Sequence, residues 1–427
     1  MSTPEAAAKG KKRPGLLRRF FSVLGPGLIS GAADDDPSGI ATYSIAGAQL
    51  GTALLWTAWL TWPLMAAVQM MCARIAMVTG RGLAGALSQK FPRWSLVFVS
   101  IALLGANTIN IGADLAGMAD AAEMLTGWNS HYFVVLFGVG IAWATIRLRY
   151  YQIAGALKWL TLVLFAYIAT AFYVGPNWGS VLREALQPSV PGREAWGMLV
   201  AILGTTISPY LFFWQASQEV EEEKAMGRRM LRSRLGATSR EIGDRKIDVG
   251  VGTFFSNVVM FFIILTTALT LHRHGLTRIE TSREVAEALR PLAGRFAELL
   301  YTVGLLGVGL LAIPTLSGSA AYAFAETFGW RQGLDSKLRS ARYFYGIVIL
   351  STAAGIALDF LGVNPVRALY WTAVVNGLLA PFLLIGILAV ACDRKCMQNQ
   401  PSSWLGRSVV ALTAVFMFGA AIGMFVF

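Results

Sequence analysis

Charge is scarce in this chain of 427 residues. Only 14% of its residues are charged, about half the share typical of a soluble domain. Hydrophobic residues make up 55% of the chain, and its mean hydropathy is +0.56. This balance excludes a disordered chain, a coiled coil and an ordinary soluble enzyme. It is typical of a chain that keeps most of its length in lipid.

Cysteine and histidine are scarce as well, with three residues of each. Three cysteines exclude a disulfide framework. Cys392 and Cys396 flank charged residues with no histidine nearby, so we expect a reduced pair at a helix end rather than a metal site. The sequence shows no nucleophile–base pair and no nucleotide-binding loop. We therefore expect neither an enzyme nor a bound cofactor.

Long apolar runs fill most of the sequence. They are far longer than the strands of a membrane barrel and lack period-two alternation, so an all-α membrane protein is predicted. We expect a basic N-terminal segment over residues 1–20 and one transmembrane domain over residues 21–427. Eleven candidate spans lie near residues 21–48, 52–78, 95–125, 131–146, 152–175, 194–218, 249–272, 298–327, 343–362, 366–391 and 405–426.

The net charge of +12 follows the predicted topology. Residues 1–20 hold six Lys or Arg and one acid, and they lack the apolar core and cleavage site of a signal peptide. With the N-terminus in the cytoplasm, cytoplasmic segments hold 28 of the 36 Lys and Arg, and outer segments hold 8. This bias predicts a multi-pass protein of the bacterial inner membrane with its C-terminus outside. The lipid bilayer is the expected partner, nucleic acid is not, and the oligomeric state stays open.

The first span contains three consecutive acids. Residues 31–39 read Gly-Ala-Ala-Asp-Asp-Asp-Pro-Ser-Gly. Each carboxylate near the bilayer centre costs about 2.5–3.5 kcal/mol on insertion scales. Pro37 removes a backbone donor and disfavours helix at Asp36. We therefore expect an unwound segment whose freed carbonyls and acids face a watery cavity. The alternative is a polar edge loop, with the span beginning near Ile40.

The sixth span repeats this device. Residues 204–214 read Gly-Thr-Thr-Ile-Ser-Pro-Tyr-Leu-Phe-Phe-Trp, and Pro209 lies 209 − 37 = 172 residues after Pro37. Five spans run from the first motif to the second. A proline-broken helix at the start of each five-span half predicts a LeuT-type inverted repeat of helices 1–5 and 6–10. In that architecture the broken helices 1 and 6 face each other at the bilayer midplane.

The third span carries a polar face. Asn107, Asn110 and Asp114 are spaced by three and four residues, which places them on one side of a helix. An intramembrane Asp with two amides indicates the lining of a cavity. The alternative is a structural network of hydrogen bonds between helices.

These motifs resemble the NRAMP family of divalent-metal transporters over nearly the whole chain. The stretch "GPGLISGAADDDPSGIATYSIAGAQLG" is similar to the family's first helix, with its Asp-Pro-Gly-Asn followed by Ile-Ala-Thr. "MVTGRGL" from Met77 to Leu83 resembles the family's cytoplasmic Val-Thr-Gly segment, and "GADLAG" from Gly112 to Gly117 resembles its third helix. The resemblance implies the inverted repeat and, in most members, proton-coupled uptake of Mn²⁺ or Fe²⁺.

The family's site residues are only partly kept. Its metal-binding Asp falls on Asp36, but its soft Met ligand, which favours transition metals, falls on Ser208. Its third-helix Asp falls on Asp114, and the Glu that follows falls on Gly117. The family's Asn, Ala and His fall on Gly39, Thr205 and Tyr210, so the soft ligand and the proton relay are missing together.

The chain looks more like the NRAMP-related magnesium transporters, which also lack the Met and are not proton-driven. The segments "GLLAIPTLSGSAAYAFAE" and "VVNGLLAPF" resemble that branch. Mg²⁺ prefers oxygen ligands, keeps several waters and needs only one or two carboxylates. We therefore expect a secondary transporter that moves a hard divalent cation, Mg²⁺ first, by alternating access without proton coupling. The alternatives are a transporter of the same fold for another small or organic cation, and a non-transporting membrane protein.

The expected site gathers residues from the two breaks and the third span. Asp36 is the expected metal ligand, directly or through water. The expected substrate-binding residues are Asp36, Ser38, Gly39, Thr205, Ser208 and Tyr210, the cavity lining is Asp34, Asp35, Asn107, Asn110 and Asp114, and the breaks are at Pro37 and Pro209.

Overall fold

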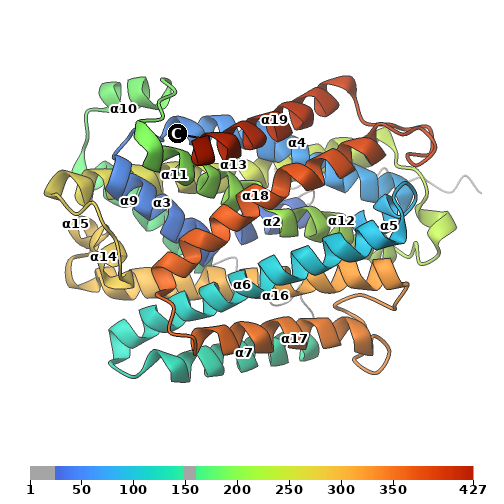
Figure 1. The fold of residues 1–427 in the computed structure, drawn as a ribbon, viewed down its shortest axis with the longest axis horizontal. Helices are drawn as coiled ribbons and strands as arrows, with labels where there is room; N and C mark the ends of the chain where they lie inside the picture. Colours follow the sequence, from blue (N-terminus) through green and yellow to red (C-terminus); the bar gives the residue numbers. More distant parts are fainter. Residues whose placement is uncertain (1–24, 149–159, 427) are drawn as a thin grey trace, which may run out of the picture.

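The computed structural model describes residues 25–148 and 160–426, and these contain helices and no strand. The predicted basic segment 1–20 and part of the predicted fifth span lie outside the described residues. Short 3-10 turns occur at 160–164, 231–234, 272–274 and 294–296. The α-helices (Figure 1) are α2 (Pro26–Asp34), α3 (Pro37–Leu50), α4 (Trp56–Thr79), α5 (Leu83–Leu87), α6 (Arg93–Thr126), α7 (Ser130–Arg147), α9 (Phe165–Val174), α10 (Trp178–Ala185), α11 (Gly192–Thr206), α12 (Pro209–Ala225), α13 (Ser239–Thr270), α14 (Ser282–Glu287), α15 (Arg290–Ala293), α16 (Ala297–Phe328), α17 (Arg342–Asp359), α18 (Pro365–Ala391) and α19 (Trp404–Val426).

The all-helical membrane architecture predicted from the sequence is confirmed. Eight helical segments among the described residues are long and apolar enough to cross a bilayer, and each coincides with a predicted span. The other three predicted spans correspond to the broken pair α2–α3, to α9 with the turn before it, and to α17. The number of eleven crossings therefore stays a prediction.

The two halves of the chain repeat the same order of elements. A broken helix, a long helix, a short helical segment and two further long helices occur as α2–α7 and again as α11–α17. The third helices of the two halves, α6 and α16, pack side by side and run in opposite directions, and so do α7 and α17 (Figure 1). This arrangement is the predicted inverted repeat.

Both helix breaks occur at the predicted prolines and have the same backbone form. At the first break Asp35 has φ −79° and ψ 55°, and Asp36 is extended with ψ 172°. At the second break Ile207 has φ −118° and ψ 57°, and Ser208 is extended with ψ 133°. The matching pairs lie 172 residues apart (35 + 172 = 207, 36 + 172 = 208). The two breaks are therefore equivalent positions of the repeat.

Glycines allow α2 to lie directly against the backbone of α13. A Cβ at Gly31 would meet the carbonyl oxygen of Gly252 at 2.4 Å, and one at Gly27 would meet the backbone nitrogen of Val249 at 2.7 Å. No side chain fits at these distances. The contact between the first half-helix and α13 is therefore backbone against backbone, as small residues permit in membrane helices.

The described ends of the chain lie at opposite ends of the bundle. The end of α19 lies with α10 and α14, whereas α5 lies at the other end (Figure 1). The start of α2 is hydrogen-bonded to Asp248, in the first third of α13. The same part of α13 contacts the end of α12 through Arg245 and Glu222, and α12 packs against α5. This agrees with an odd number of crossings, and the assignment of the α5 end to the cytoplasm stays a prediction from the charge bias.

Candidate functional site

Asp36 lies in the first break and caps α3. Its Oδ1 accepts hydrogen bonds from the backbone nitrogen of Gly39 at 2.7 Å and from the Ser38 hydroxyl at 2.8 Å. Pro37, the first residue of the helix, has no N–H to be satisfied. One oxygen of the carboxylate is thus used to begin the second half-helix.

The other oxygen of Asp36 faces two further elements. Its Oδ2 lies 3.2 Å from the Asn110 amide nitrogen on α6 and 3.3 Å from the Tyr210 hydroxyl on α12. That hydroxyl also lies 3.0 Å from the carbonyl oxygen of Ala33, which the end of α2 leaves free. Helices α3, α6 and α12 therefore converge on one carboxylate.

The remaining second-break residues point elsewhere. The Ser208 hydroxyl donates to the carbonyls of Gly204 at 2.7 Å and Thr205 at 2.6 Å, both on the preceding half-helix α11. The Thr205 hydroxyl lies 3.0 Å from that of Tyr43 on α3. Thr205 also faces Gly39, where a Cβ would lie 3.1 Å from the threonine Oγ1. Thr205 and Gly39 thus bring the two half-helices α11 and α3 together.

The three polar residues of α6 serve different neighbours. Asn107 donates to the Leu316 carbonyl at 2.8 Å and to the Ser319 hydroxyl at 2.9 Å, both on α16. Asn110 reaches Asp36, whereas Asp114 is wholly buried and neither carboxylate oxygen has a hydrogen-bond partner among the described residues. Asn107 thus lies in a contact between helices, while Asn110 lies at the break.

The three consecutive acids divide into two groups. Asp36 faces α6 and α12, whereas Asp34 and Asp35 face the hydroxyl of Ser256 on α13, at 2.6 Å and 3.2 Å. The polar side chains of the predicted site are no more than 5% exposed. In this conformation the structure is therefore closed around the breaks.

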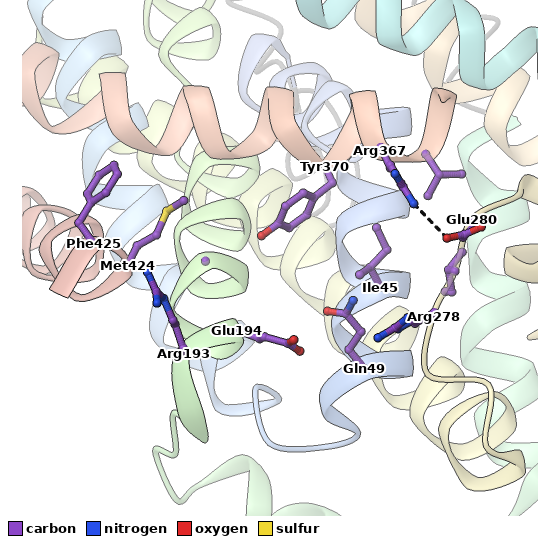
Figure 2. A pocket seen from close by; sticks show the side chains of 13 residues that line it. Ile45, Gln49, Arg193, Glu194, Arg278, Glu280, Arg367, Tyr370, Met424 and Phe425 are labelled. Atoms are coloured by element: carbon purple, nitrogen blue, oxygen red, sulfur yellow. Dashed lines mark hydrogen bonds and ion pairs between the residues drawn. The ribbon is translucent and has the colours of Figure 1, made fainter. Parts of the chain in front are cut away.

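A separate cavity of about 620 Å³ lies at the α10 end of the bundle (Figure 2). The ends of α3, α11, α18 and α19 and the segment before α14 line it, and Arg367 and Glu280 form an ion pair at 3.0 Å on its wall. It contains none of the predicted site residues. Gln49 on its wall lies ten residues after Gly39 on α3, or about 15 Å along the helix.

At the opposite end, a charged network that is buried except for Glu222 joins α2, α12 and α13. Arg245 pairs with Glu219 at 2.8 Å, with Asp248 at 2.6 Å and with Glu222. Asp248 in turn accepts hydrogen bonds from the backbone nitrogens of Gly25 and Gly27 at 2.7 and 2.8 Å. We call Arg245, Glu219, Glu222 and Asp248 the α2 clamp, because it holds the start of the first half-helix.

Hydrogen bonds extend the α2 clamp toward the break, and a separate ion pair ties down the loop after α12. Ser30 donates to Gln215 at 2.6 Å, and Gln215 donates to Glu219 at 2.7 Å. Arg228, in the loop after α12, pairs with Glu241. This hydrogen bond raises the pKa of Arg228, so the guanidinium stays charged.

Sequence reasoning missed the α2 clamp, Tyr43 and the pairing role of Ser256. The signal for Tyr43 was its place four residues after Gly39, on the same face of α3. The clamp was signalled only by the density of charge over residues 219–248.

The comparison with known families identifies the chain's lineage. Residues 27–427 match the profile of the natural resistance-associated macrophage protein-like (Nramp) proteins. The chain belongs to the Nramp family. The family resemblance predicted from its motifs is thereby confirmed.

Named Nramp relatives cover nearly the whole chain. The divalent metal cation transporter MntH of Caldanaerobacter subterraneus subsp. tengcongensis is 27% identical over 440 residues, covering 98% of this chain and 96% of the relative. The MntH of Aeromonas hydrophila is 25% identical over 422 residues, covering 92% and 94%. The expectation that this Nramp protein is no enzyme is confirmed, because these relatives are transporters.

Solved structures show the same fold. The manganese transporter of Eremococcus coleocola, in complex with an aromatic bis-isothiourea compound, matches with a TM-score of 0.72 at 18% identity, covering 99% of this chain and 88% of that one. The structure of MhsT in complex with L-phenylalanine matches with a TM-score of 0.56 at 13% identity, covering 93% and 98%. The LeuT-type architecture is thus confirmed for this Nramp chain.

Proposed function

We propose that this Nramp-family protein is a secondary transporter that moves a hard divalent cation, Mg²⁺ first, by alternating access. The observation that supports this most is the buried Asp36 carboxylate in the first helix break, approached by Asn110 and Tyr210 from two other helices. The relatives named as divalent metal cation transporters support a divalent cargo.

The donors around Asp36 favour a hard ion. They are carboxylate, amide, hydroxyl and backbone carbonyl oxygens, which suit Mg²⁺ and offer no sulfur to a soft ion. Asn110 contributes an amide oxygen that is buried and has no hydrogen-bond partner among the described residues. Gly39 and Ser38 hold one oxygen of Asp36 by short hydrogen bonds, whereas Asn110 and Tyr210 approach the other at 3.2 and 3.3 Å, so the second oxygen is the one that would bind the cation, directly or through its water.

The same residues support transport without proton coupling. Tyr210 occupies the position where the family resemblance places a His, and tyrosine has a reference pKa of about 10, far from neutral pH. Gly117 occupies the position of the third-helix Glu and cannot titrate. The cation would then move down its own gradient and with the membrane potential, which supplies about 2.3 kcal/mol per charge per 100 mV.

Uptake of Mg²⁺ into proteoliposomes loaded with a fluorescent Mg²⁺ indicator tests the proposal. We expect Asp36→Ala to reduce uptake at least tenfold, as expected for loss of the main charged ligand, and to leave expression normal. Asp244→Asn, a substitution outside the break, should keep the wild-type rate. Cd²⁺ should compete no better than its affinity for oxygen ligands allows. Wild-type uptake by Asp36→Ala, or strong selective inhibition by Cd²⁺, would contradict the proposal.

A further inference from the structure

Asp34 and Asp35 form a buried acidic pair without a basic partner. Asp34 is 0% exposed and Asp35 is 5% exposed. The ion pairs of the described residues include neither of them. An uncompensated buried charge costs several kcal/mol, and two adjacent ones also repel each other. The pair is therefore neutralised either by bound protons or by a bound cation.

The geometry around Ser256 shows where a counter-charge fits. Its hydroxyl lies 2.6 Å from Asp34 Oδ2 and 3.2 Å from Asp35 Oδ1, but a hydroxyl has one hydrogen and can donate to only one of them. When both carboxylates are ionised, the other contact has no hydrogen between its two oxygens. Asp34 Oδ1 is also buried and has no hydrogen-bond partner among the described residues. Oxygens from two helices thus meet here with unused lone pairs.

This cluster is distinct from the surroundings of Asp36. The pair faces α13 through Ser256, whereas Asp36 faces α6 through Asn110 and α12 through Tyr210. Where α2 crosses α13, the backbone of Gly31 lies against that of Gly252, one helical turn before Ser256. The cluster is therefore held at a tight helix crossing.

We propose that Asp34, Asp35 and Ser256 form a second cation site, separate from Asp36, for one hard divalent cation. Two carboxylates balance two positive charges, so the occupied site is neutral inside the membrane. Two carboxylates and a hydroxyl, completed by water or backbone carbonyls, are the donors that Mg²⁺ and Mn²⁺ accept. An ion there links the end of α2 to α13.

Mn²⁺ serves as the probe, because its paramagnetism lets bound and free ion be counted. The full-length purified protein is titrated with Mn²⁺, and the bound equivalents are measured by electron paramagnetic resonance. We expect two equivalents for the wild type, one for Asp34→Asn, one for Asp36→Asn and none for the double variant. The control Asp244→Asn should bind two.

The decisive comparison is between Asp34→Asn and Asp36→Asn. The second site is supported if Asp34→Asn binds one Mn²⁺ fewer than the wild type while Asp36→Asn still binds the ion at Asp34 and Asp35. This result would hold even if Asp36 itself bound no Mn²⁺. It is overturned if Asp34→Asn and the wild type bind the same number, as they would if protons alone neutralise the pair. If Asp34→Asn does not fold, Ser256→Ala replaces it. This variant should weaken one of two Mn²⁺ affinities at least fivefold, and unchanged affinities would overturn the proposal.

Discussion

At the scale of single residues, Gly39 and Thr205 distinguish this site from the family's pattern. A Cβ at position 39 would lie 3.1 Å from the Thr205 Oγ1 and 3.4 Å from a ring carbon of Tyr43. The family resemblance places Asn at position 39 and Ala at position 205. Position 39 therefore carries a smaller residue than the family's and position 205 a larger one. The two changes compensate in volume, because Thr205 fills the space that a larger residue 39 would need.

We predict that Gly39→Asn lowers Mg²⁺ uptake at least tenfold, while Gly39→Asn combined with Thr205→Ala recovers part of it. The single substitution overpacks the contact between α3 and α11, which typically costs about 1–3 kcal/mol. Removing the threonine hydroxyl and methyl makes room for the amide. Uptake rates and thermal unfolding of both variants measure the effect. Gly243→Asn, at a position with open space around it, is the matched control. A double variant no better than the single one would refute this coupling.

The sequence predicted which residues gather at the breaks but not how they are shared. Helical spacing placed Asn107 and Asn110 on one face, yet one turn along α6 is enough for Asn107 to reach α16 while Asn110 reaches Asp36. Within the unwound segment no period applies. The direction of Asp34 and Asp35 depends on backbone angles that a sequence does not display. Their separation from Asp36 therefore became visible only in three dimensions.

At the scale of elements, the α2 clamp fixes one half of a broken helix. Since α2 has only nine residues, its backbone contact with α13 and its hydrogen bonds to Asp248 are its main anchors. We expect that opening of the site toward the α5 end moves the start of α2 away from this position. The clamp contacts would then have to break during such a movement.

We predict that Arg245→Gln loosens α2. Removing the guanidinium leaves Glu219 and Asp248 as buried charges without their partner, and breaking a buried pair in this way costs about 3–5 kcal/mol. Amide hydrogen exchange over residues 26–34 should become at least fivefold faster. Arg240→Gln, which removes an exposed and distant pair partner of Asp244, should leave exchange in α2 unchanged. Equal exchange in Arg245→Gln and the wild type would show that the clamp does not hold the helix.

The long elements were predictable, whereas the short ones were not. Hydropathy located most spans within a few residues of their helices, but α13 begins ten residues before its predicted span (249 − 239) and α12 ends seven residues after its own (225 − 218). Pro37 and Pro209 located the breaks, because each of these signals is local in sequence. Helices such as α5, α14 and α15 have four to six residues. They are shorter than any hydropathy window and owe their form to the helices they pack against.

At the scale of the whole molecule, one exposed cysteine allows the predicted membrane orientation to be tested. Cys392 is exposed in the segment after α18, whereas Cys72 and Cys396 are buried, and burial raises the pKa of the Cys396 thiol. Because the thiolate is the reactive form, Cys392 is the one cysteine expected to react quickly with a maleimide.

We predict that a membrane-impermeant maleimide labels Cys392 in inside-out vesicles and not in intact cells. The reason is that the positive-inside bias assigns this segment to the cytoplasm. Labelling is measured by a mass shift on a gel, and Cys392→Ser should remove it. Labelling of intact cells would reverse the orientation of the whole molecule.

The second prediction at this scale concerns energetics. If transport is uncoupled, proteoliposomes containing a pH-sensitive dye should show no acidification when Mg²⁺ is added at a fixed membrane potential. The physical reason is that Tyr210 and Gly117 stand where the family resemblance places a His and a Glu, and neither titrates near neutral pH. Acidification that depends on Mg²⁺ and disappears in Asp114→Asn would reveal a relay through α6.

The pairing of Asp34 and Asp35 with Ser256 also has a consequence for how the chain is made. Together with Asp36, these acids raise the cost of placing the first span in lipid by roughly 8–10 kcal/mol on insertion scales. Ser256 follows Asp34 by 222 residues, so at about 5–20 residues per second the ribosome needs roughly 10–45 s to supply it. During that time the nascent first span lacks the partner that the finished protein provides. Its stay at the translocon, or beside a membrane chaperone, should therefore be longer than that of spans without such a cluster of acids.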